Sequence, residues 1–130
     1  MDGISVNEAY KILKDDGVLW VAGKNGGGKF IQSVTVIEKP HDFKNLQEGE
    51  MLLATLYQFP IQKDIMNFLI KAQGNQAVCA GIRLHNDQFS DIPESLLTLL
   101  DRLNSPLFVF NKDVPFSIII KKLYSANCKS

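Results

Sequence analysis

The chain has 130 residues, of which 45 % are hydrophobic, and its 14 basic side chains are balanced by 14 acidic ones. This length fits one domain with a core that needs no disulfide or metal, and no segment reaches the ~18 consecutive apolar residues of a membrane-spanning helix. The neutral charge disfavours direct nucleic-acid contact, which requires a basic excess. With no secretion signal and only two cysteines, outside any metal-ligand pair, we expect a cytoplasmic protein without a cofactor.

The N-terminal segment, residues 5–16, has the apolar spacing of an amphipathic helix. Its expected buried face consists of Val6, Ala9, Tyr10 and Leu13. Ser5 and Glu8 have the spacing of a capping box, in which each side chain satisfies a free amide at the helix start. Gly17 follows at the position where a helix commonly ends in a left-handed conformation.

Two strands are predicted after this helix, "VLWVA" at residues 18–22 and "FIQSVTVIE" at residues 30–38. Both are rich in β-branched and aromatic residues. The segment between them, residues 23–29, contains four glycines. We therefore expect an antiparallel hairpin with a glycine-rich loop.

The second half alternates strands and helices. Strands are predicted at 50–57 ("EMLLATLY"), 77–84 ("AVCAGIRL") and 106–110 ("PLFVF"), and helices at 61–72, after Pro93 and near the C-terminus. The expected buried stripes are Leu96, Leu99, Leu100 and Leu103 on the second of these helices and Phe116, Ile119, Ile120 and Leu123 on the last. Crossover helices favour parallel strands. The predicted fold is a single α/β domain with a mixed sheet, in which an N-terminal helix and hairpin precede a β-α-β-α-β-α half.

The glycine-rich loop matches the phosphate-binding spacing G-x-x-x-x-G-K from Gly23 to Lys29. A working phosphate loop has Ser or Thr after the lysine to bind Mg²⁺, and it opens a helix. Here Phe30 follows the lysine and a strand is predicted next. We interpret the segment as a mobile hairpin loop in which Gly26, Gly27 and Gly28 provide conformational freedom, with Lys24 and Lys29 as exposed charges.

Few residues suggest catalysis. His41 and His85 lie in separate polar segments, and neither belongs to a nucleophile or metal motif. Cys79 lies in an apolar run, where a small buried side chain is expected. An enzyme would require these three residues to meet around one cleft.

Polar residues at the ends of predicted strands form the candidate ligand site, because open α/β sheets bind ligands at the carboxyl ends of their strands. Glu38, Thr55 and Arg83 occupy such positions. Arg83 suits a carboxylate or another anion, Glu38 an amide or ureido donor, and Thr55 could orient the ligand. The alternative is that Glu38 and Arg83 form a structural ion pair or are two solvated strand ends.

The chain resembles the N-terminal domain of PucR-type transcriptional regulators, the purine catabolism regulatory protein-like family. The resemblance rests on "VTVIEKPHDFKNLQEGEMLLATLYQF" (34–59), "AGIRL" (80–84), "IPESLLTLLDRLNSPLFVF" (92–110) and "VPFSIIIKKL" (114–123). The opening helix and the Ala-Gly loop match in position. The chain departs from the family at Ala54, where a threonine is usual, and at Gly28, where a leucine is usual.

The resemblance implies a non-catalytic, ligand-sensing domain at residues 1–126 of a bacterial regulator of purine or nitrogen-compound catabolism. Residues 127–130 would then lead to a C-terminal helix-turn-helix domain that contacts DNA. The expected partners are a small nitrogenous metabolite, that C-terminal domain and a second copy in a homodimer. The alternative is a protein–protein interaction or dimerisation module without a small ligand.

Overall fold

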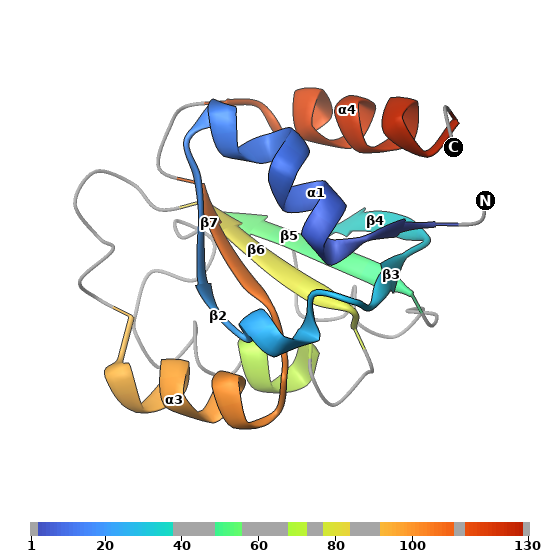
Figure 1. Ribbon diagram of the computed structural model, residues 1–130. Helices are drawn as coiled ribbons and strands as arrows, with labels where there is room; N and C mark the ends of the chain where they lie inside the picture. The colour runs from blue at the N-terminus through green and yellow to red at the C-terminus, as the bar shows by residue number, and fades with distance from the viewer. Residues whose placement is uncertain are drawn as a thin grey trace.

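The computed structural model describes residues 3–37, 49–55, 68–72, 77–83, 92–110 and 114–128. Its centre is a five-stranded sheet in the order β2-β7-β6-β5-β4 (Figure 1). The strands are β2 (Val18–Ala22), β4 (Ser33–Val36), β5 (Glu50–Thr55), β6 (Cys79–Arg83) and β7 (Leu107–Phe110). Strands β4 to β7 are parallel, and β2 pairs with β7 in the antiparallel direction. The predicted mixed α/β fold is confirmed.

Helices cover both faces of this sheet (Figure 1). On one face lie α1 (Val6–Leu13) and α4 (Phe116–Cys128), and on the other lie α3 (Glu94–Arg102) and the helical residues 68–72. Alternate residues along each central strand contribute to two separate apolar clusters, so the sheet is buried on both sides. None of the described helices is long and apolar enough to cross a membrane.

The first helix begins at the predicted cap and leads to Gly17 as predicted, but the Glu8 carboxylate contacts the Ser5 hydroxyl instead of a backbone amide. The Ser5 hydroxyl oxygen accepts a hydrogen bond from the Glu8 backbone amide at 3.1 Å and donates to the Glu8 carboxylate. Val6, Ala9 and Leu13 are fully buried and Tyr10 is half-buried. A short 3₁₀ turn, η1 (Lys14–Asp16), extends the helix to Gly17, whose φ of 83° is left-handed.

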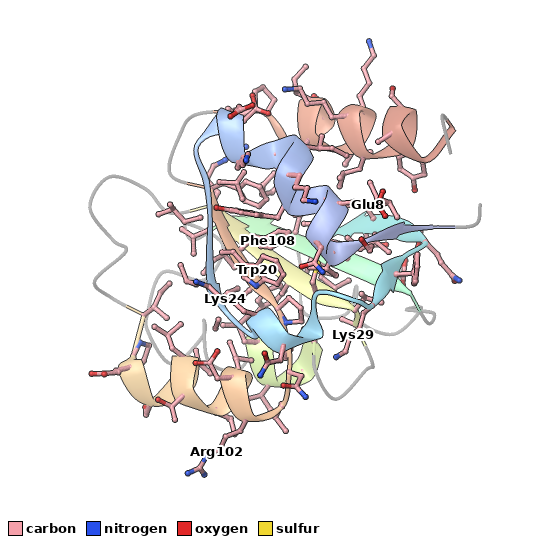
Figure 2. All side chains as sticks on the ribbon, in the orientation of Figure 1. Glu8, Trp20, Lys24, Lys29, Arg102 and Phe108 are labelled. Atoms are coloured by element: carbon pink, nitrogen blue, oxygen red, sulfur yellow. The ribbon has the colours of Figure 1, made fainter. Side chains whose placement is uncertain are left out.

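The predicted hairpin is wrong. Strand β2 pairs with β7, where Trp20 is opposite Phe108 and the two rings meet edge to face with centroids 5.3 Å apart. Figure 2 shows these two side chains together beside the sheet. Local sequence favoured a neighbouring strand as the partner of β2, but pairing with β7 joins two aromatic side chains and extends the central sheet.

The predicted strand at 30–38 is divided. Residues Phe30–Ile31 form β3, which pairs with β1 (Ile4–Ser5) in a separate two-stranded sheet, and β4 starts after Gln32. The Gln32 amide donates to the Gly49 carbonyl at 2.7 Å, which turns the chain toward β5. Two backbone hydrogen bonds from α1 to the glycine-rich loop hold β3 beside β1 instead of beside β2.

The predicted stripe of α3 is partly wrong. Leu96 and Leu100 are buried, but Leu99 and Leu103 are 40 % and 41 % exposed. The buried face turns toward Leu97, which packs against the core, and Leu103 follows the end of the helix. On α4, Ile119 and Leu123 are buried and the other two predicted members are half-buried.

Candidate functional site

The carboxyl edge of the parallel strands brings together two of the predicted site residues at backbone level. Thr55 of β5 is in register with Arg83 of β6, and Arg83 is in register with Phe110 of β7. Glu38 lies outside the described residues, as does the side chain of Thr55. Arg83 is therefore the predicted site residue whose side chain the structure describes.

Arg83 lies on the face of the sheet that α1 and α4 cover, because it alternates with Ile82, which faces α3. Its guanidinium carbon is 4.4 Å from the ring centroid of Phe116, the first residue of α4. Its Nε and Nη2 atoms are shielded from solvent and have no hydrogen-bond partner among the residues that the structure describes. In the part of the chain that the structure describes, no acidic side chain forms an ion pair with it. The arrangement leaves cationic donors available for an anion.

The stacking of Arg83 on Phe116 depends on a glycine that the sequence analysis did not single out. A Cβ atom at Gly81 would lie 2.5 Å from the ring of Phe110, so the ring occupies the space beside this glycine. The Phe110 ring contacts the Phe116 ring edge to face, with centroids 5.8 Å apart. Gly81 lies two residues before Arg83 on the same face of β6. This glycine was the feature of the sequence that could have predicted close packing beside Arg83. Small and aromatic residues on neighbouring strands thus position α4 over Arg83.

The glycine-rich loop lies at the opposite, amino edge of the parallel strands, and its polar groups are already used within the protein. The Gly23 amide donates to Asp101 Oδ1 at 2.7 Å, and Lys29 Nζ donates to the Asn104 carbonyl at 2.9 Å. Figure 2 shows Lys24 and Lys29 on either side of the loop. The loop opens no helix longer than η2 (Lys24–Gly26), a 3₁₀ turn of three residues. This geometry agrees with the prediction that the segment is not a phosphate loop.

The interpretation that three glycines of this loop provide conformational freedom is wrong for Gly26 and Gly27. Gly26 and Gly27 have ordinary backbone with negative φ. Glycine is required at both positions because neighbouring atoms leave no room for a Cβ atom. An added Cβ would lie 2.0 Å from the Ser105 carbonyl oxygen at Gly23, 2.2 Å from the Asn104 carbonyl oxygen at Gly26, and 2.1 Å from Asn7 Oδ1 at Gly27. Only at Gly28 would it meet nothing within 4 Å. The loop is packed tightly against the connection between α3 and β7.

A polar cluster at the amino edge was missed from the sequence. Glu50, the first residue of β5, is 9 % exposed, and its Oε1 accepts hydrogen bonds from the hydroxyls of Thr35 at 2.5 Å and Ser33 at 3.4 Å. Ser33 and Thr35 alternate along β4, so they share one face and reach the same carboxylate. The alternating hydroxyl residues in "SVTV" were the feature of the sequence that could have predicted this cluster.

Enzyme chemistry gains no support among the described residues. Cys79 is fully buried, and this burial raises the pKa of its thiol far above the ordinary value, which disfavours a nucleophilic thiolate. His41 and His85 lie outside the described residues. Within the described ranges, no group of three or more His, Cys, Asp or Glu side chains could hold a metal ion.

The fold and the site together define an α/β/α domain with a cationic side chain at the carboxyl edge of its parallel strands. The chain belongs to the purine catabolism regulatory protein-like family, whose model matches residues 11–126. This match confirms the resemblance seen in the sequence.

A curated relative supports the same assignment. The chain is 23 % identical over 123 residues to the purine catabolism regulatory protein of Bacillus subtilis (strain 168). The alignment covers 94 % of this chain and 23 % of that protein. The chain thus corresponds to less than a quarter of the length of its relative.

Proposed function

We propose that this chain is the non-catalytic, ligand-sensing domain of a cytoplasmic bacterial transcriptional regulator of purine or nitrogen-compound catabolism. The family match over residues 11–126 carries this proposal. The name of the Bacillus subtilis relative, purine catabolism regulatory protein, points to the regulation of purine catabolism. The unpaired donors of Arg83 at the carboxyl edge supply a physical reason for a small ligand to bind.

The proposed organisation assigns residues 1–126 to the regulatory domain and residues 127–130 to a connection leading to a C-terminal helix-turn-helix domain. DNA contact belongs to that second domain, consistent with the balanced charge of this one. A ligand regulates such a protein by binding one arrangement of the domains, or of a homodimer, better than another. Glu38 and Thr55 remain proposed ligand contacts beside Arg83.

A thermal-shift screen with purines, ureides and related carboxylic acids tests the proposal. A specific ligand at 100 times its Kd should stabilise the domain by about 2.7 kcal/mol through mass action. The matched variants are Arg83→Gln at the carboxyl edge and Lys24→Gln in the exposed part of the glycine-rich loop. We expect the first to abolish the shift and the second to retain it.

The second candidate function is an interaction or dimerisation module without a small ligand. Leu99 on α3 and Leu103 directly after it favour this function, because both side chains are partly exposed. This alternative is supported if none of these compounds raises the melting temperature while the domain self-associates in sedimentation experiments. That result would contradict ligand sensing.

A further inference from the structure

The two unpaired nitrogens of Arg83 belong to one edge of its guanidinium group. Nε–H and one N–H of Nη2 point in the same direction and form a fork with two parallel donors. Both atoms are shielded from solvent and lack an acceptor in the described structure. A carboxylate presents two oxygens at the spacing of this fork and accepts both hydrogen bonds at once. The geometry of these two donors therefore specifies a ligand group more closely than a positive charge alone would.

The surroundings of Arg83 favour an anion over a neutral acceptor. Phe116 covers one face of the guanidinium, leaving the edge for polar contacts. The amides of Phe116 and Ser117 begin α4 and have no acceptor within the helix, so the positive end of the helix dipole lies near the same site. Buried donors without acceptors cost free energy, and a bound carboxylate would relieve this cost.

We propose that Arg83 receives the carboxylate of a small acid through its Nε–Nη2 edge, and that this binding shifts the start of α4. The inference rests on the proposed sensing function and adds the ligand group and the moving element. Solvent scarcely reaches either nitrogen, so a carboxylate can pair with them only after neighbouring groups move. Phe116 is the neighbour in direct contact, and it belongs to α4.

The rest of α4 can remain in place while its first turn shifts. Ile119 and Leu123 are buried in the core beneath the helix, whereas Ser117 and Ile118 are exposed. Lys122 also forms an ion pair with Asp16 at 2.6 Å, which ties the middle of α4 to the turn after α1. The ligand favours the state with the shifted first turn, because the carboxylate binds this state better than the arrangement in which Phe116 packs against Arg83.

The test uses acetate, benzoate and N-carbamoylglycine, each compared with its neutral amide. We expect at least one acid to raise the melting temperature and to move the Arg83 Nε–H resonance downfield, while its amide does neither. In the first turn of α4, the Ile118 amide, which donates to the Pro115 carbonyl at 3.0 Å, should then exchange hydrogen faster. Arg83→Lys keeps the charge but removes the fork, so it should lose both the thermal shift and the faster exchange, with an unchanged circular dichroism spectrum.

One control variant separates acid binding from the movement of α4, and one measurement on the unmodified domain guards against a variant that does not fold. Phe116→Leu should retain acid binding and lose the change in α4 exchange, because the aromatic contact that links Arg83 to the helix is gone. If Arg83→Lys does not fold, the Nε–H resonance of the unmodified domain decides the question alone. The inference is overturned if none of the acids moves that resonance. Stabilisation by neutral purines that persists in Arg83→Lys would also overturn it, while leaving the proposed sensing function intact.

Discussion

The polar groups at the two edges of the parallel strands differ in whether the protein satisfies their hydrogen bonds. At the amino edge, the Glu50 carboxylate accepts two hydroxyl donors and Lys29 donates to a backbone carbonyl. At the carboxyl edge, two nitrogens of Arg83 are buried without an acceptor in the described structure. The first edge is satisfied by the protein itself, whereas the second has unmet hydrogen-bonding capacity.

This difference distinguishes a motif with a packing role from a site that we propose to bind a ligand. The glycine-rich loop resembled a ligand site in sequence, but its close contacts to the α3–β7 connection give it a packing role. Arg83 belongs to no ligand-binding motif of its own, yet its surroundings leave it suited to bind a ligand group. The comparison predicts that substitutions will reduce stability at the amino edge and affect binding at the carboxyl edge.

The largest effect is expected in the glycine-rich loop. Gly23→Ala places a methyl group against backbone atoms at a residue with left-handed φ, and should lower the free energy of unfolding by about 3 kcal/mol. Gly28→Ala meets open space and should change it by less than about 0.5 kcal/mol. Urea denaturation of both variants measures the difference. Equal stabilities would show that the loop is not tightly packed.

Removing a hydroxyl from the cluster at the amino edge should have a moderate effect. Thr35→Val keeps the shape of the side chain but loses the hydrogen bond to Glu50, at an expected cost of about 1.5 kcal/mol. Thr35→Ser retains the donor and should recover most of that stability. Chemical denaturation provides the measurement, and a fully stable valine variant would argue against a structural role for the cluster.

The corresponding change at the carboxyl edge should act in the opposite direction. Arg83→Met keeps an unbranched side chain and removes the unpaired donors, so the ligand-free domain should become more stable by about 1 kcal/mol after the lost contact with Phe116 is subtracted. Arg102→Met, at an exposed position on α3, is the matched control and should be nearly neutral. Destabilisation by Arg83→Met would mean that the arginine stabilises the fold. The account of an unpaired fork would then fail.

The smallest effect is expected at the ion pair between α4 and η1. The Lys122 and Asp16 side chains are 43 % and 22 % exposed, so Lys122→Ala should cost about 0.3 kcal/mol at low salt and less at high salt. Lys121→Ala, the exposed neighbour, is the control. Thermal melts at two ionic strengths measure the difference, and a large salt-independent loss would contradict the surface character of this pair.

Local features of the fold were predictable because they depend on neighbouring residues. The Ser5–Glu8 cap, the turn at Gly17 and the alternation of strands and helices after Glu50 all follow from short-range rules. The pairing of β2 was not predictable in this way, because its partner β7 lies more than eighty residues away and competes with a nearby strand. In the first half of the chain, tertiary contacts therefore determine which strands pair.

The candidate site was predictable only in part. The strand-end rule placed Thr55 and Arg83 at one edge, and the observed register confirms that placement of their backbones. The unpaired fork depends on Gly81, Phe110 and Phe116, which meet only after the sheet and α4 have packed together. No spacing in the sequence encodes such a contact.

The most direct test of the contrast between the two edges is a titration of the ¹⁵N-labelled domain with N-carbamoylglycine, followed by chemical-shift mapping. We predict that the perturbed resonances will belong to Thr55, Arg83, Phe110 and the first turn of α4, and that residues 23–29 will remain unchanged. Perturbations centred on the glycine-rich loop, with Arg83 unaffected, would contradict the account.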